Sequence, residues 1–318
     1  MKFEEPDNRL DLELGGRSVS IGLTNDQLAG LELTADIDRA WGLRVFTGLP
    51  KTPVSEKGIF RNLVYGGKIE ARPSEFCAVG LSMSKDNGRD TAEMTSLDFK
   101  LDIGSMVTLN GVSAYQGGEQ RSHRYSARFR RKAFYLTPVY EYVYPRVEAE
   151  RFQAEPHRFG FLSTDDEAVS IAGSDLGWEG DERLALGLKA RRYAYTWQDE
   201  IAFYYAATFG LKAPAGGHLD MEFGRMQGGL CETRYTLAEA DLVYADPFGL
   251  DGASLNADVR FIDYDQAVRG VDTALHTSWG IGFEFLDGRL ETRLSCTQKA
   301  DPFTGDDLGV VLSIRFDS

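Results

Sequence analysis

Long apolar stretches are missing from this sequence. No run of 18 or more residues is apolar, which excludes a transmembrane helix. Mean hydropathy is −0.31, and hydrophobic residues make up 42% of the 318 residues. By hydropathy alone the chain would be classed with water-soluble proteins. Its length allows one large all-β domain or two ordinary domains.

Cysteine and histidine are also scarce, and acidic residues outnumber basic ones by 49 to 35. The three cysteines, Cys77, Cys231 and Cys296, form no C-x-x-C pair and no C-x-x-C-H haem-attachment motif. The four histidines show no metal-ligand spacing, and no phosphate-binding or dinucleotide-binding motif is present. We therefore expect no metal, no cofactor and no enzymatic activity. The net charge of −14 argues against a nucleic-acid partner, which would need clustered positive charge.

What the sequence does contain is alternation with a period of two. In the segment LDFKLDI at 97–103, for example, apolar residues alternate with aspartate and lysine. Similar runs of roughly ten residues follow one another, separated by Gly, Asp, Asn or Pro. No linker or shift in composition divides them. The pattern predicts an all-β chain with a single domain over residues 1–318 and about 18 strands, roughly 16–20.

Alternation of this kind has two physical solutions. In a soluble sandwich the apolar faces of two sheets pack together. In a membrane barrel the apolar face turns outward to lipid and the polar face lines the lumen. The period alone does not distinguish them, because it gives two faces but not which face is enclosed.

Aromatic residues and connection lengths favour the antiparallel up-and-down transmembrane β-barrel. Tyrosines lie near the ends of several runs, among them Tyr193 and Tyr195, where an interface between lipid and water would hold them. Tight turns expected at Gly15-Gly16, Gly104-Ser105 and Asp287-Gly288 alternate with longer connections. The three longest, at 50–62, 144–166 and 265–275, all fall on one side. Short periplasmic turns and longer outer loops are typical of outer-membrane barrels.

The end of the chain carries the most specific pattern. DLGVVLSIRF at 307–316 resembles the C-terminal signal of bacterial outer-membrane β-barrels, with its positions filled by Asp307, Gly309, Leu312, Ile314 and Phe316. The chain departs from that signal because Asp317 and Ser318 follow the aromatic residue, which is usually the last. The resemblance implies a porin-like barrel in the outer membrane, with membrane lipid and the barrel-assembly machinery as partners.

Two further segments, LVYGGKIEARPSEFCAVGLSMSKDN and FYLTPVYEYV, are similar in style to porin-like barrels that carry electrons across the outer membrane of anaerobic bacteria. An exported barrel needs a signal peptide, and MKFEEPDNRL lacks the apolar segment of one. We therefore expect a mature form restarted at Met1 or a fragment that lacks an upstream strand.

A barrel of this size would leave an aqueous lumen. Charged residues on the polar face of the strands are the candidates to line it: Asp98, Lys100, Asp102, Arg124, Arg128, Arg130, Asp258, Arg260, Glu284, Arg293 and Arg315. Both signs of charge are present, which predicts a porin-type channel for small polar solutes or ions. Two alternatives stay open: a structural sheath around a partner such as a multihaem cytochrome, and a soluble β-sandwich with a binding role.

Overall fold

The computed structural model describes most of the chain. The described residues are 2–4, 10–21, 24–38, 40–50, 63–86, 92–117, 119–143, 168–180, 183–196, 199–213, 217–246, 252–285, 290–302 and 305–316. They form strands almost throughout, and the helix among them is a short 3-10 turn, η3 (Cys231–Thr233). None of the helices in these ranges is long and apolar enough to cross a membrane.

The strands follow one another along the chain. They are β1 (Lys2–Glu4), β2 (Leu10–Ile21), β3 (Thr24–Asp36), β4 (Trp41–Pro50), β5 (Val64–Ser74), β6 (Cys77–Asp86), β7 (Ala92–Ile103), β8 (Val107–Gln116), β9 (Glu119–Arg131), β10 (Phe134–Val143), β11 (Val169–Glu179), β12 (Leu184–Tyr195), β13 (Glu200–Lys212), β14 (His218–Gln227), β15 (Tyr235–Ala245), β16 (Ala253–Val268), β17 (Val271–Phe285), β18 (Leu290–Asp301) and β19 (Gly305–Phe316). Their number falls within the range that the sequence predicts.

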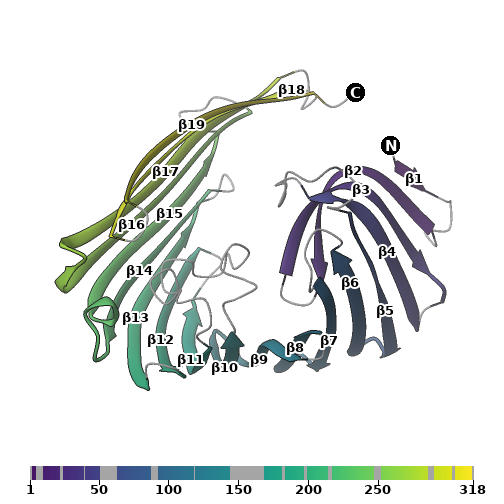
Figure 1. Ribbon diagram of the computed structural model, residues 1–318, viewed down its shortest axis with the longest axis horizontal. Coiled ribbons are helices and arrows are strands. Elements are labelled where there is room, and N and C mark those ends of the chain that lie inside the picture. Colours follow the sequence, from purple (N-terminus) through teal and green to yellow (C-terminus); the bar gives the residue numbers. More distant parts are fainter. Residues whose placement is uncertain are drawn as a thin grey trace. The chain divides into compact units, whose positions relative to one another are not determined.

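Two compact units divide these strands. Unit 1 comprises Met1–Arg130 and Thr137–Ala172, and unit 2 comprises Arg131–Leu136 and Gly173–Ser318. In unit 1 each strand from β1 to β9 pairs antiparallel with the next. In unit 2 the same holds from β12 to β19. Each unit is therefore a curved up-and-down sheet, as Figure 1 shows.

The connections alternate between two ends of the strands. We call one the loop end, where β12 meets β13, β14 meets β15 and β16 meets β17. The other end of unit 2 is the turn end, where β13 meets β14. In unit 1, Gly104 between β7 and β8 has a φ of 59°, a left-handed backbone conformation that glycine adopts without strain.

Two connections differ from the sequence-based prediction. The turn expected at Gly15-Gly16 is absent, because β2 runs through both residues and pairs Gly15 with Gly30 of β3. The long loop expected at 265–275 is a two-residue turn at Arg269 and Gly270, whose positive φ values of 51° and 84° suit a tight hairpin. The other two long loops, at 50–62 and 144–166, lie almost entirely outside the described residues.

Candidate functional site

Most of the paired strands present two chemically different faces. In an antiparallel pair, residues directly opposite each other share a face, so the register carries each face from strand to strand. One face, the apolar face, includes Leu97 of β7, Val259 of β16 and Leu294 of β18. The opposite face, the charged face, includes their neighbours Asp98, Asp258 and Arg293.

The apolar face is the exposed one. Leu188 is 59% exposed, Phe223 is 56% exposed and Leu312 is 63% exposed. On the charged face, Ser96 and Tyr204 are both 0% exposed. A water-soluble sheet with one solvated side shows the reverse order, with its apolar residues buried. Exposed apolar area on this scale marks a surface that contacts lipid or another apolar partner.

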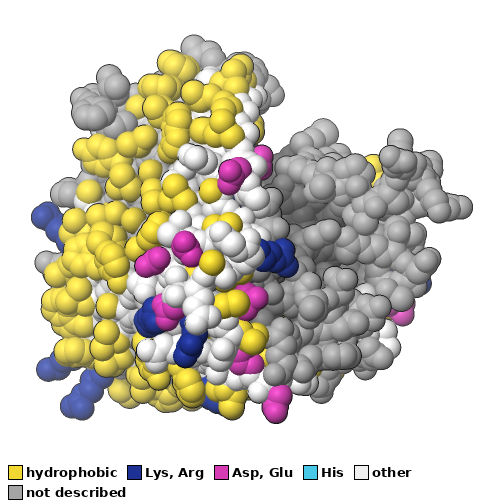
Figure 2. All heavy atoms as spheres, turned by 60° about the vertical axis from the view of Figure 1, so that its left-hand side comes forward, with side chains coloured by type: hydrophobic (Ala, Val, Ile, Leu, Met, Phe, Trp, Pro, Cys, Tyr) yellow, Lys and Arg dark blue, Asp and Glu magenta, His cyan; other side chains and the backbone are white. Residues whose placement is uncertain are grey.

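Figure 2 shows this surface on unit 2. Hydrophobic side chains gather in a broad patch over the described strands, and lysine and arginine side chains lie along its edge. The exposed members in unit 2 include Leu176, Leu186, Leu188, Ile201, Phe203, Tyr205, Leu211, Phe223, Tyr244, Val259, Phe261, Trp279, Phe283, Phe285, Leu294, Leu308, Val310, Leu312 and Ile314. In unit 1 the same face packs aromatic rings over a glycine: Phe99 and Tyr125 stack across Gly111 of β8.

The lumen candidates from the sequence lie together on the charged face. By register, Asp98, Lys100, Asp102, Arg124, Arg128 and Arg130 share it in unit 1, and Asp258, Arg260, Glu284 and Arg293 share it in unit 2. For Arg315 the structure describes the backbone, which pairs with Glu291. That these residues line a lumen stays a prediction.

Ion pairs cross the charged face of unit 1. Lys68 Nζ on β5 lies 2.8 Å from Asp98 Oδ2 on β7, so the pair spans the intervening strand β6. The crossing point is Gly80 of β6, where a Cβ atom would lie 2.4 Å from Lys68 Cε. A larger residue at position 80 would therefore push the two charged side chains out of this contact. The cationic set of β9 is also partnered, since Arg124 Nε lies 2.8 Å from Glu141 Oε1.

Unit 2 carries a similar network on its charged face. Arg191 pairs with Asp175 at 2.6 Å and Arg260 pairs with Glu239 at 2.7 Å. Glu222 forms an ion pair with the ammonium group of Lys189 and accepts a hydrogen bond from the hydroxyl of Tyr204. Opposite charges on neighbouring strands stabilise the pairing of those strands in this register. The charged groups lie on the side of the sheet opposite the apolar face.

An apolar cluster on the charged face at the loop end of unit 2 was not anticipated. It comprises Tyr193, Tyr195, Tyr204, Met226, Tyr235, Leu237, Ile262 and Tyr264, all buried. The interpretation of Tyr193 and Tyr195 as residues of a lipid–water interface is therefore wrong. The sequence gives little signal here, because on β13 both alternating sets are apolar: Ala202 and Tyr204 on one face, Phe203 and Tyr205 on the other.

A buried carboxylate fixes the connection next to this cluster. Glu200, at the start of β13, is 8% exposed. Its Oε1 accepts hydrogen bonds from the backbone N–H of Gly229 at 2.7 Å and of Leu230 at 3.0 Å, and from the hydroxyl of Thr233. The segment 228–234, which joins β14 to β15, is thus tied to the strand beside it. Nothing in the sequence pattern indicated a role for Glu200.

The residues of the C-terminal signal divide between the faces of β19. Leu312 and Ile314 are exposed on the apolar face, whereas Asp307 and Gly309 alternate with them on the charged face. Phe316, the last residue of β19, pairs with Leu290 of β18. Recognition of this strand by an assembly machinery stays a prediction.

One set of described residues brings together possible metal ligands. His218, Asp220 and Asp241 lie on the charged face of β14 and β15 near the turn end. Sequence spacing did not reveal them, because the register of two strands, and not a motif, places Asp241 beside the other two.

Comparison with known proteins identifies the fold. No family model matches the chain, and no curated protein matches it in sequence. Among solved structures, OccK11 (OpdR) of Pseudomonas aeruginosa is similar with a TM-score of 0.57 and 11% identity, covering 97% of this chain and 93% of that one. OccK8 (OprE) of the same organism gives a TM-score of 0.56 and 10% identity over 92% of each chain.

A BenF-like porin from Pseudomonas fluorescens Pf-5 is similar to the same degree, with a TM-score of 0.55, 10% identity, and coverage of 97% of this chain and 96% of that one. The chain therefore has the all-β, up-and-down fold of bacterial outer-membrane porins, as the sequence predicts. The alternative of a soluble β-sandwich is wrong, because the fold is a porin fold and the apolar face is exposed.

Proposed function

We propose that this protein is a porin-type channel of the bacterial outer membrane, through which small polar solutes or ions pass along the charged face of the strands. The observation that carries the proposal is the sign of the alternation: apolar side chains are exposed on one face, and charged, paired side chains share the other. The porin fold supports it over nearly the full length of the chain.

Lipid is the solvent that suits the apolar face. In a bilayer each backbone N–H and C=O must find a partner within the protein, and antiparallel neighbours supply these partners along both units. Alternate positions then present Leu, Val, Phe and Trp to hydrocarbon. Outer-membrane lipid is accordingly the first partner that we propose for this chain, and the barrel-assembly machinery, acting on 307–316, is the second.

Water and solute suit the charged face. Lys68 with Asp98 across β6, and Arg260 with Glu239 on neighbouring strands, place fixed charges of both signs on this face. Such walls create a local field that orients polar solutes and discriminates between ions. The residues that we propose to contact the solute are the partly exposed members of this set, among them Lys100, Asp102 and Arg293.

Site-directed labelling in lipid vesicles tests which face meets water. In a background without Cys77, Cys231 and Cys296, one variant carries Asp258→Cys and its matched control carries Val259→Cys. These adjacent residues of β16 lie on opposite faces. A membrane-impermeant maleimide should modify the first and spare the second. Modification of Val259→Cys alone would overturn the assignment of the faces.

Conductance separates the channel from the sheath that the sequence left open. The purified full chain, added to a planar bilayer, should produce discrete current steps, and heat-denatured protein should produce none. If the labelling pattern shows that the chain inserts but no current is ever recorded, the channel proposal is contradicted. Isolation together with a haem-absorbing protein that blocks the current would favour the sheath.

A further inference from the structure

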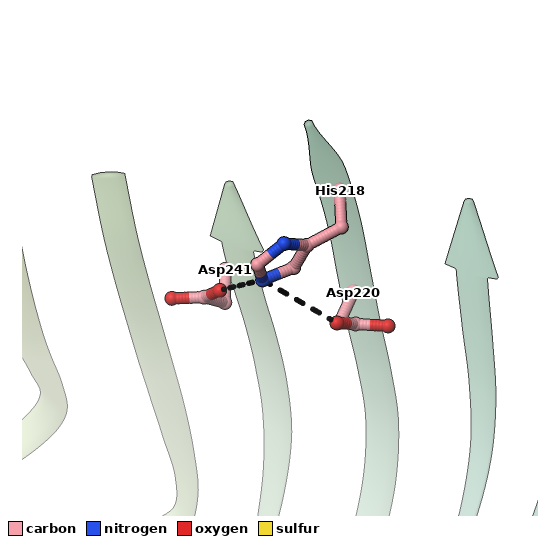
Figure 3. Close-up of side chains that lie close together, drawn as sticks. All are labelled: His218, Asp220 and Asp241. Atoms are coloured by element: carbon pink, nitrogen blue, oxygen red, sulfur yellow. Dashed lines mark ion pairs between the residues drawn. The ribbon is translucent and has the colours of Figure 1, made fainter. Parts of the chain in front are cut away.

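Three side chains converge on one point of the charged face of unit 2, as Figure 3 shows. His218 and Asp220 come from β14 and Asp241 comes from β15. His218 Nε2 lies 3.3 Å from Asp241 Oδ1 and 4.0 Å from Asp220 Oδ2. One ligand atom from each residue lies within 4.8 Å of the other two.

The sheet register places an excess of negative charge at this point. Asp220 is directly opposite Asp241, and Asp241 is directly opposite Asp258 of β16. Like charges directly opposite each other on neighbouring strands destabilise a sheet. A positive charge placed beside this row of three carboxylates would therefore stabilise the sheet.

The adjacent row shows how the protein compensates elsewhere. Glu222 and Glu239 are also directly opposite each other, but Lys189 pairs with the first and Arg260 with the second. Among the residues that the structure describes, the ion pairs of Asp220 and Asp241 are made with His218. An imidazole nitrogen that carries a lone pair can also bind a metal ion.

We propose that His218, Asp220 and Asp241 bind a divalent transition-metal ion, with Asp258 adding negative charge beside it. One imidazole nitrogen and two carboxylate oxygens form a ligand set that suits Zn²⁺, Co²⁺ or Mn²⁺, whereas Ca²⁺ and Mg²⁺ prefer oxygen ligands alone. All three side chains are partly exposed, so water completes the coordination and the ion exchanges with solution. The ion supplies the positive charge that lysine and arginine side chains supply to the neighbouring row of carboxylates.

The site goes beyond the proposed channel and does not depend on it. Metal binding is measured on the folded chain in detergent, where no current is needed, so failure of one proposal leaves the other standing. A bound ion on the charged face would also alter the field that a passing solute meets.

Titration with Co²⁺ and Zn²⁺ tests the site. The full chain, freed of metal with a chelator, should bind one equivalent of Co²⁺ with a visible absorption band, and Zn²⁺ should displace it. His218→Ala and the isosteric Asp241→Asn should each weaken binding at least tenfold. A matched control is His276→Ala, since His276 is also on the charged face but lies directly opposite Arg260 and Lys299.

Folding of each variant is checked by circular dichroism and by the heat-dependent shift of its band on a gel. Asp220→Asn, which preserves shape, repeats the test if His218→Ala fails to fold. Unchanged Co²⁺ affinity in the folded His218 or Asp241 variants would overturn the proposal. So would an equal loss of affinity in His276→Ala, because binding would then be unrelated to this set of residues.

Discussion

Leu294 and Ser295 are consecutive residues near the middle of β18, and their side chains lie on opposite faces of the sheet. Leu294 is 40% exposed on the apolar face, and Ser295 is on the charged face opposite Gly280 and Val311. We expect Leu294→Arg to lower the free energy of unfolding from lipid vesicles by about 2–4 kcal/mol, the cost of a charge facing the middle of the bilayer. Ser295→Arg should lower it by less than about 1 kcal/mol, since its charge meets polar surroundings.

Urea titration of the chain folded into vesicles, followed by tryptophan fluorescence, measures both values. The pair distinguishes lipid from water directly. On a water-facing surface an arginine in place of an exposed leucine changes stability by no more than about 0.5 kcal/mol. Equal stability of the two variants would therefore show that the apolar face does not contact hydrocarbon.

Individual faces could be predicted from the sequence, but individual partners could not. Alternation placed Asp98 and Arg260 correctly with the other charged residues, because side chains of a strand point to opposite sides in turn. It did not indicate that Lys68 reaches Asp98 across β6, which depends on the register of three strands and on the missing side chain of Gly80. Nor did it find the His218–Asp241 contact, which depends on the register of two strands.

At the scale of elements, the segment 228–234 offers a test of how a connection is held. Glu200→Ala removes the acceptor of three hydrogen bonds from Gly229, Leu230 and Thr233. Hydrogen bonds to a charged group contribute roughly 1.5–3 kcal/mol each to stability. We expect the variant to open this segment and to raise the rate of trypsin cleavage after the exposed Arg234 at least tenfold.

Glu232→Ala is the matched control, because this carboxylate lies in the same segment and accepts a hydrogen bond from the thiol of the neighbouring Cys231. Its cleavage rate should stay within about twofold of the unmodified chain, a difference of no more than about 0.4 kcal/mol. If Glu200→Ala is cleaved no faster than the control, Glu200 does not hold the connection.

Strand positions were more predictable than the connections between them. The run before residue 265 has a clear period of two, and so has the run after 275, yet the residues between them extend both strands to a two-residue turn. Where a strand extends beyond the apolar band, its residues on both faces can be polar. Such a stretch has the composition of a loop, so the sequence alone predicts a loop there. The glycines of β2 misled in the same way, because Gly15 and Gly16 pair with β3 and do not turn the chain.

At the scale of the molecule, the sign of the alternation separates a porin fold from a sandwich. The sequence contains the two faces but not the medium that each one meets, since that depends on which face the closed or stacked sheet encloses. The structure shows which face is enclosed in each unit. In unit 2, Leu312 and Phe283 on the apolar face are exposed, and in unit 1, Ser96 on the charged face is buried. The same arrangement explains why mean hydropathy is low in a chain with an extensive apolar surface: most strands carry polar residues on one of their two faces.

Charge on the whole molecule leads to a prediction of ion selectivity. The chain carries 49 acidic and 35 basic residues, and the row Asp220, Asp241 and Asp258 concentrates negative charge on the charged face. We expect a channel that prefers cations. Under a KCl gradient, its reversal potential should have the same sign as the equilibrium potential of potassium. Raising salt from about 0.1 M to about 1 M shortens the screening length from roughly 10 Å to roughly 3 Å and should reduce the preference.

Two variants identify which charges set that preference. Asp220→Asn combined with Asp241→Asn should move the reversal potential toward zero, whereas Arg124→Gln combined with Arg128→Gln should move it further toward the potassium value. The first set lies on the charged face of unit 2 and the second on the charged face of unit 1. A preference for anions that disappears in the arginine variant would mean that the β9 arginines, and not the carboxylates, control passage.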